Sequence, residues 1–170
     1  MINRPQPDEY APYYGKYIAL VGDEPIITIL ESLKESSYQF FKGLPAHKGD
    51  FAYGEGKWTI KEVLGHMMDA ERTFAYRVLC FSREETILPG FDQEVYMMKA
   101  TFNSRPLEEL AEEFKAIREA NLYLFRALTK EQETQKGIAS GNPVSVRALL
   151  YMIAGHELHH LNILKAKYLD

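Results

Sequence analysis

Histidines in two separate stretches of the chain have the spacing expected of metal ligands. The later stretch reads Gly-His-Glu-Leu-His-His over residues 155–160, and His66 lies far before it. Residues four apart on a helix lie about 40° apart around its axis, so His156 and His160 project from one face. With His66 they offer three neutral imidazoles to one transition metal, with a coordination position left open for water or substrate. Such an open position is typical of a reaction centre.

The remaining histidines and the identity of the metal are less constrained. His159 lies about 60° from His156, on the side away from His160. It could replace His160 as a ligand, contact a ligand without binding the metal itself, or face a partner protein. His47 lies in a predicted loop and is interpreted as a solvent-exposed residue. Imidazole donors suit zinc, nickel, iron or copper, because they discriminate poorly between these metals by affinity.

The same stretch also matches His-Glu-x-x-His, the zinc protease pattern in which the glutamate, here Glu157, is the general base. The surroundings argue against a protease. The extended pattern requires a glycine and a further histidine after the second ligand, where this chain has Ile163 and Ala166. The other form needs a carboxylate on a later helix, for which the ten residues after His160 leave little room. Two roles remain possible for Glu157: it could act as a general base, or it could contact a metal ligand without binding the metal.

Four segments with helical periodicity are expected to position these residues. The first is predicted over residues 23–43, with Asp23 as its N-cap and Pro25 in its first turn. The second begins at Thr59, because Thr-Ile-Lys-Glu over residues 59–62 is a capping box. This second helix places His66 beside its apolar stripe.

The third and fourth helices follow the same reasoning. The third follows Ser104 and has Pro106 in its first turn, and the fourth starts near Ser145, after a turn at residues 141–143. No segment shows sustained strand alternation. Four amphipathic helices of this length predict an all-α four-helix bundle.

The longest connection, about residues 83–104, joins the second and third helices. A link of that length can cross the bundle and start the third helix parallel to the second, which predicts an up-down-down-up topology. Residues 92–99 are expected to form a short helix over one bundle end. The side chains of Phe91, Asp92, Gln93 and Tyr96 could cover the open metal position or simply pack. The first 22 residues, rich in tyrosine, are expected to pack across the bundle.

Three further positions have alternative interpretations. Trp58, just before the second helix, either packs the helix entry or forms a pocket wall. Asp69, one turn after His66, is interpreted as a solvated charge or as an acceptor that orients a ligand. Cys80 lies too far along the same helix to be a ligand.

Composition favours an ordinary soluble domain spanning residues 1–170. The chain has 46% apolar residues, a net charge of −4 and one cysteine. It has no cluster of lysine and arginine that could neutralise a run of phosphates, so no nucleic-acid partner is expected. No stretch approaches the roughly 20 apolar residues of a membrane span. We therefore expect a cytoplasmic protein with neither a membrane nor a nucleic-acid partner.

Two motifs carry a resemblance to a known family. Residues 57–72, Lys-Trp-Thr-Ile-Lys-Glu-Val-Leu-Gly-His-Met-Met-Asp-Ala-Glu-Arg, resemble the opening of the second helix of the DinB/YfiT-like metalloenzymes. Residues 145–150 and the histidine stretch resemble the last helix of that family. The similarity extends from about residue 25 onward. It implies an up-down-down-up bundle, often dimeric, with one divalent metal on three histidines that correspond to His66, His156 and His160.

The resemblance also implies a class of function. Characterised members include thiol-cofactor-dependent S-transferases and a mycothiol-dependent isomerase. We therefore expect a metal-dependent transferase or hydrolase that acts on a small molecule, with zinc, nickel, iron or manganese as the cation. A low-molecular-weight thiol as second cofactor and a homodimer are further expectations. The alternative is a non-catalytic bundle that binds metal or dimerises. Catalytic residues are not assigned by the sequence.

Overall fold

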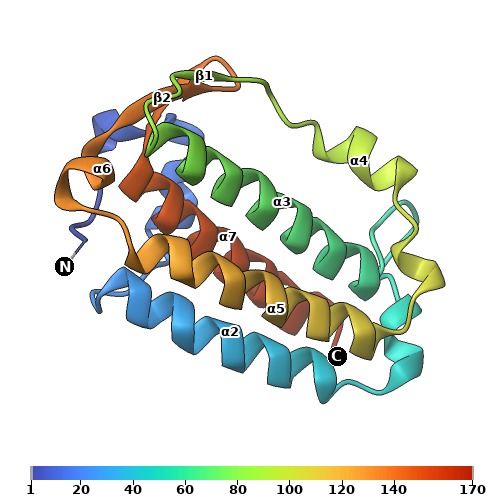
Figure 1. The fold of residues 1–170 in the computed structure, drawn as a ribbon. Helices are drawn as coiled ribbons and strands as arrows, with labels where there is room; N and C mark the ends of the chain where they lie inside the picture. Colours follow the sequence, from blue (N-terminus) through green and yellow to red (C-terminus); the bar gives the residue numbers. More distant parts are fainter. Residues whose placement is uncertain (1, 170) are drawn as a thin grey trace.

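The computed structural model describes residues 2–169, and four long helices form its framework. They are α2 (Ile26–Lys42), α3 (Ile60–Phe81), α5 (Leu107–Arg126) and α7 (Val146–Lys167). Helices α2 and α7 run in one direction, whereas α3 and α5 run in the opposite direction (Figure 1). The predicted four-helix bundle with up-down-down-up topology is therefore confirmed.

Side-chain caps fix the start of two predicted helices. The Thr59 hydroxyl accepts a hydrogen bond from the Glu62 amide at 3.1 Å, and the Glu62 carboxylate accepts one from the Thr59 amide at 2.8 Å. Ser145 accepts a hydrogen bond from the Ala148 amide at 3.1 Å, at the start of α7. Both caps lie where the sequence placed them, because a cap depends on atoms within three residues of each other.

The predicted start of the first helix is wrong. Helix α2 begins at Ile26, and Pro25 occupies the capping position with an extended backbone. Asp23 lies too early in the chain to reach the free amides of the first turn, and it instead lies 3.6 Å from Arg4. The same correction applies to Pro106, which caps α5 and does not lie in its first turn. In both cases the proline is one residue outside the helix.

A small sheet was not predicted from the sequence. Strand β2 (Lys136–Ala139) pairs antiparallel with β3 (Asn142–Ser145) and parallel with β1 (Ile87–Leu88). The predicted turn at residues 141–143 is wrong, because the hairpin turns at Ser140 and Gly141, which both have positive φ. Strands of two to four residues are too short to show alternation, and one pairing joins segments about 50 residues apart.

The crossover between α3 and α5 contains the predicted short helix, α4 (Gln93–Lys99), which Asp92 caps. The crossover starts at the sheet and runs back along the outer side of α3 to the end where α3 begins (Figure 1). A 3-10 turn, Phe102–Ser104, completes it. Helix α4 thus lies beside α3, whereas the sequence placed it over a bundle end.

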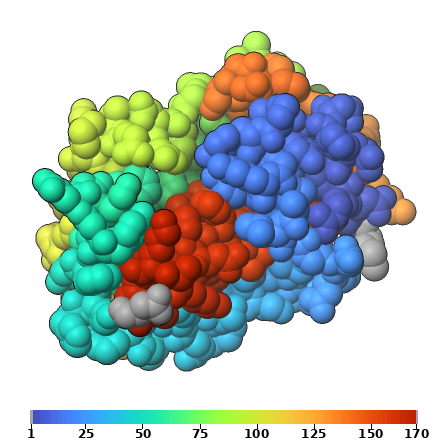
Figure 2. Space-filling model, turned by 180° about the vertical axis from the view of Figure 1, so that it is seen from behind, coloured from blue at the N-terminus to red at the C-terminus, as the bar shows by residue number. Residues whose placement is uncertain are grey.

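Residues 2–22 pack across the bundle, as predicted for this segment. They contain two short 3-10 turns, Pro7–Glu9 and Pro12–Tyr14, and α1 (Gly15–Ile18). This segment lies against α7 on the face seen in Figure 2. Other short elements are a 3-10 turn, Ala46–Asp50, after α2 and α6 (Lys130–Thr134) before the hairpin.

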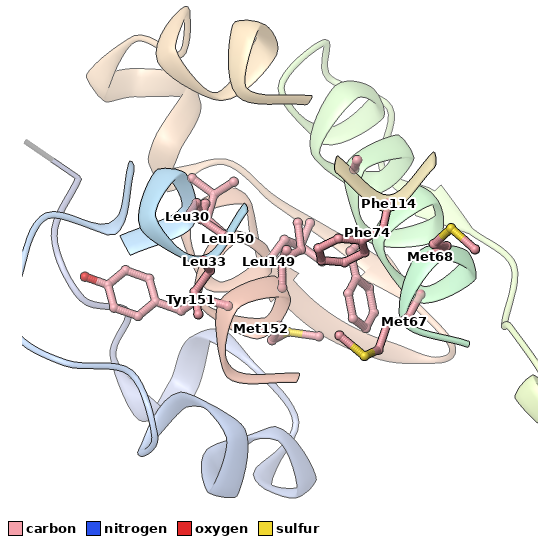
Figure 3. Close-up of a cluster of buried hydrophobic side chains, with 14 of the residues drawn as sticks. Leu30, Leu33, Met67, Met68, Phe74, Phe114, Leu149, Leu150, Tyr151 and Met152 are labelled. Carbon is pink, nitrogen blue, oxygen red and sulfur yellow. The ribbon is translucent and has the colours of Figure 1, made fainter. Parts of the chain in front are cut away.

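The N-terminal segment makes α7 the central helix of the molecule. Residues 148–157 are all buried, although the sequence pattern indicated a single apolar stripe. Gly155 permits the close contact, because a Cβ atom there would lie 2.2 Å from the Tyr17 carbonyl oxygen. The core around α7 includes Leu149 and Met152 (Figure 3). Within residues 2–169, no helix is long and apolar enough to cross a membrane.

Candidate metal centre

The three predicted ligands lie together between α3 and α7. The Nε2 atom of His156 lies 3.0 Å from Nε2 of His66 and 3.1 Å from Nε2 of His160. Ligand atoms of all three residues lie within 4.8 Å of one another. The i, i+4 spacing on α7 therefore places two rings on the face that meets His66, as the sequence predicted.

The chemistry of this donor set fits a shared cation. A neutral imidazole carries one hydrogen on its two nitrogens, so His156 Nε2 can donate to one neighbour at most. Hydrogen bonds alone therefore leave the cluster incompletely satisfied, whereas one cation can accept a lone pair from every ring. Nitrogen ligands around a tetrahedral zinc lie roughly 3.3 Å apart, close to the two distances between Nε2 atoms.

Burial keeps these rings neutral. It lowers the pKa of His66 to about 4. Burial, followed by the proximity of His66 and His159, lowers the pKa of His160 to about 3. Burial, followed by the proximity of His160, His66 and His159, lowers the pKa of His156 well below its usual value. All three rings therefore offer lone pairs at neutral pH, which is the form that binds a metal.

Aromatic side chains surround the cluster and hold the rings. Trp58 packs on His66 with ring centres 4.9 Å apart. Tyr17 and Phe74 pack against His156, with ring centres 5.7 and 6.2 Å away. These contacts restrict the rotation of the imidazoles and reduce the access of water.

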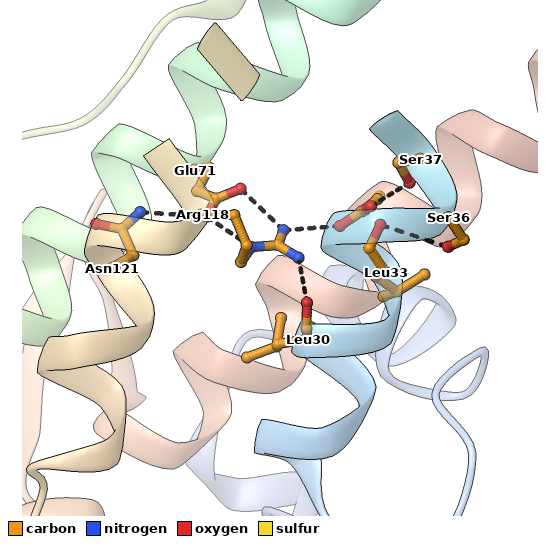
Figure 4. Close-up of polar contacts among 8 residues, drawn as sticks. Leu30, Leu33, Ser36, Ser37, Glu71, Arg118 and Asn121 are labelled. Carbon is orange, nitrogen blue, oxygen red and sulfur yellow. Dashed lines mark hydrogen bonds and ion pairs between the residues drawn. The ribbon is translucent and has the colours of Figure 1, made fainter. Parts of the chain in front are cut away.

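The glutamate of the protease pattern is bonded to residues outside the cluster. Glu157 is 2% exposed, accepts a hydrogen bond from Arg118 at 2.7 Å and a second from Ser37. Arg118 also binds both carboxylate oxygens of Glu71, at 2.7 and 2.8 Å, and the Leu30 carbonyl at 3.2 Å (Figure 4). Glu157 is thus committed to a buried ion network that joins all four long helices.

This network decides between the roles left open for Glu157. A general base must reach the reacting proton directly or through one water, whereas both carboxylate oxygens of Glu157 are already bonded, one to Ser37 and the other to Arg118. Arg118 and Glu71 were not singled out in the sequence. No local signal could identify them, since each lies in a charged stretch that reads as a solvated helix face.

The other histidines and the remaining candidates lie outside the cluster. His159 is half-buried and packs against Tyr17 and His160, with ring centres 5.0 and 5.2 Å away. His47 is exposed, as predicted. Asp69 lies 3.9 Å from Arg72, and within residues 2–169 it has no hydrogen bond to a histidine. Asp69 is half-buried, and burial raises its pKa, so neither predicted role describes it well.

Two cavities adjoin the cluster on different sides. The larger one, about 280 Å³, is bordered by His160 and Trp58, which makes Trp58 a pocket wall. The smaller one, about 80 Å³, is bordered by His66 and His156. Gln93 of α4 borders both cavities. The cluster therefore lies between two spaces that could hold small molecules.

The crossover covers the site in part, as the sequence suggested. Gln93 and Phe91 border the cavities at the cluster. Asp92 instead caps α4, with its carboxylate 3.0 Å from the Glu94 amide. Tyr96 packs on Phe91, with ring centres 4.8 Å apart, and borders a different cavity. Cys80 lies outside the cluster, as predicted.

Comparison with known proteins assigns the family. Residues 29–164, which include the three histidines, match the sequence model of the DinB superfamily. The chain belongs to the DinB superfamily. Over 115 residues it is also 31% identical to a protein of Oceanobacillus iheyensis whose name proposes a metal-dependent hydrolase. That match covers 66% of each chain, so this chain spans about two-thirds of the relative's length.

Solved structures share the fold of this superfamily member. YfiT from Bacillus subtilis, described as a probable metal-dependent hydrolase with an unusual four-helix bundle topology, superposes with a TM-score of 0.69 at 16% identity, over 96% of this chain and 90% of its own. The DinB-like YjoA of Bacillus subtilis gives 0.60 at 20% identity, over 83% and 87%. A mycothiol-dependent maleylpyruvate isomerase gives 0.62 at 12% identity, over 85% and 61%.

Proposed function

We propose that this DinB superfamily protein is a metal-dependent enzyme in which His66, His156 and His160 hold one divalent cation. The observation that carries the proposal is the convergence of three neutral imidazoles, two buried and one half-buried, beside two cavities. When bound by neutral donors, a cation keeps its full positive charge and makes a coordinated water or thiol more acidic. The name of the Oceanobacillus iheyensis relative supports hydrolysis as the reaction class.

The surrounding residues supply what such a reaction needs from the protein. The imidazoles stay unprotonated at neutral pH and so remain available as ligands. Tyr17 borders the smaller cavity, and its hydroxyl lies 2.9 Å from that of Tyr13. Burial, with Tyr13 close by, raises the pKa of Tyr17, so its hydroxyl stays protonated at neutral pH and can donate a hydrogen bond to a substrate.

Thiol transfer is the second candidate, and one observation favours it. A hydrolase needs space for one organic substrate, whereas a transfer reaction needs space for two. The larger cavity lies on the His160 side of the cluster and the smaller one on the side of His66 and His156. A thiol and an electrophile could therefore reach the cluster from different directions. Parallel assays with ester or amide substrates, and with thiol–electrophile pairs, distinguish the two reactions.

The metal itself is tested by elemental analysis of protein purified without a histidine tag. We expect one equivalent of a divalent transition metal in the parent, and its loss in His156→Ala. His47→Ala is the matched control, because it removes an exposed histidine outside the cluster. A parent protein that binds no stoichiometric metal, even after zinc or nickel is added, would show that the proposal is wrong.

The non-catalytic alternative predicts a different response to chelation. A structural cation stabilises the folded state, so its removal should lower the melting temperature by many degrees without any activity to lose. A catalytic cation beside open cavities should be removable with loss of activity and a smaller change in melting temperature. Paired melting and activity measurements before and after chelation separate these outcomes.

A further inference from the structure

Arg77 is a buried cation whose charge is not compensated by the described residues. It lies on α3 and is 4% exposed. Within residues 2–169, no carboxylate lies within 4.0 Å of its guanidinium. Two other arginines with little exposure have acidic partners: Arg118 pairs with two glutamates, and Arg147 pairs with Glu9. Because an unpaired buried charge is costly, its presence calls for a partner.

The groups that do contact Arg77 are neutral. Its Nη2 atom donates to the Pro89 carbonyl and to the Ser140 hydroxyl, each at 3.2 Å. Its guanidinium carbon lies 5.8 Å from the centre of the Phe74 ring, and the Tyr14 hydroxyl lies beside it. Burial lowers the pKa of Arg77, but a guanidinium stays protonated at neutral pH. A neutral donor could brace Pro89 and Ser140 equally well, so these contacts do not account for the charge.

Arg77 faces the same cavity as the candidate metal ligands. The cavity of about 80 Å³ is bordered by Arg77, His66 and His156. The Phe74 ring is close to both groups, 5.8 Å from the guanidinium carbon and 6.2 Å from the His156 ring. Added end to end, these separations place the guanidinium carbon no farther than about 12 Å from the His156 ring. A short molecule can therefore contact both.

The size and walls of the cavity restrict its occupant. At about 80 Å³ the cavity is far smaller than the roughly 300–1,000 Å³ of a typical ligand pocket, so only a short, slender molecule fits. Phe74 and Phe91 contribute apolar walls, which suit a short hydrocarbon chain. The planar guanidinium matches the geometry of a carboxylate, with which it forms paired hydrogen bonds.

We propose that Arg77 binds the carboxylate of a small organic acid, and that this acid is the substrate whose other end reaches the histidine cluster. The inference rests on the proposed metal-dependent function and adds the chemical class of the substrate to it. Arg77 acts as a specificity residue, since it selects an acid over a neutral molecule of the same length. The negative charge of the substrate also completes a buried ion pair that the protein alone lacks.

The experiment compares acids and alcohols that share a metal-binding head group. Zinc-loaded protein is titrated calorimetrically with 3-mercaptopropionate, 4-mercaptobutanoate and 6-mercaptohexanoate, and with the mercaptoalcohols of equal length. A buried charge-assisted hydrogen bond contributes about 1.5–3 kcal/mol, so we expect at least about tenfold tighter binding of the acid at one chain length or more. This preference should disappear in Arg77→Gln. It should remain in Arg83→Gln, the matched control, which removes an exposed arginine just after α3.

Further measurements separate this proposal from the metal proposal. Elemental analysis should show the same metal content in Arg77→Gln as in the parent, because Arg77 is not a ligand. Arg77→Lys should keep part of the preference for acids, since lysine retains the charge but lacks the planar pair of donors. This variant replaces Arg77→Gln in the test if Arg77→Gln does not fold. If the parent binds no metal, Arg77 can still be tested alone. Butanoate should then raise the melting temperature of the parent more than that of Arg77→Gln. Equal affinity for acids and alcohols in the parent, or an unchanged preference in Arg77→Gln, would overturn the proposal.

Discussion

The buried network around Arg118 supports a quantitative prediction about stability. Arg118 is 1% exposed and holds the carboxylates of Glu71 and Glu157, which come from two other helices. Replacing it with methionine keeps much of the side-chain volume but leaves two buried carboxylates without a cation. Loss of one partner of a buried ion pair costs about 3–5 kcal/mol. We therefore expect Arg118→Met to lower the free energy of unfolding by that amount and Tm by roughly 10 °C.

A matched control is available on the same helix. Arg126 pairs with Glu31 on the surface, and both side chains are more than 40% exposed. Solvent screens such a pair, so Arg126→Met should cost less than about 1 kcal/mol. Urea denaturation of both variants at pH 7 gives the comparison. If Arg118→Met costs no more than Arg126→Met, the network does not stabilise the helix packing and the reasoning is refuted.

The pH dependence of the same variant provides a second check. Burial raises the pKa of Glu157, and Arg118 opposes that rise, so removing Arg118 should raise the pKa further. A folded-state pKa above the unfolded value means that the folded protein binds more protons, and that stability falls as pH rises through it. The stability deficit of Arg118→Met should therefore shrink when the pH is lowered from 7 to 5. Replacing Arg118, Glu71 and Glu157 together by apolar residues should restore most of the lost stability.

Three other expectations can be tested. Gly155→Ala should destabilise the protein by about 1–3 kcal/mol and expose the first 22 residues to proteolysis, because the new Cβ would meet the Tyr17 backbone. Burial alone would raise the pKa of Glu9, but hydrogen bonds, chiefly from Arg147, lower it to about 2. Glu9→Gln should therefore cost at most about 3 kcal/mol at pH 7, and its difference from the parent in urea denaturation should vanish as pH falls from about 4.5 to about 2. The predicted homodimer should appear as twice the chain mass in light scattering.

Much of the fold could be predicted because helices are specified locally. The caps at Thr59, Ser145 and Asp92 use atoms within three residues of one another, and all three lie at the observed starts of helices. The length of the crossover was enough to predict the parallel arrangement of α3 and α5. The small sheet could not be predicted, since the pairing of Ile87 with Ile138 depends on contacts that form after the helices pack.

The site divides in the same way. The spacing of His156 and His160 on one helix determined that they share a face, because helix geometry is the same in every context. The tertiary structure alone brought His66 into contact with that pair, turned Glu157 toward Arg118 and placed Arg77 in the cavity beside the histidines. A polar residue within a helix has no local mark of burial, since burial depends on which other helix covers it. The sequence thus determined the ligand pair and the capped helix starts at Thr59 and Ser145, while packing between distant segments decided the partners of Arg118.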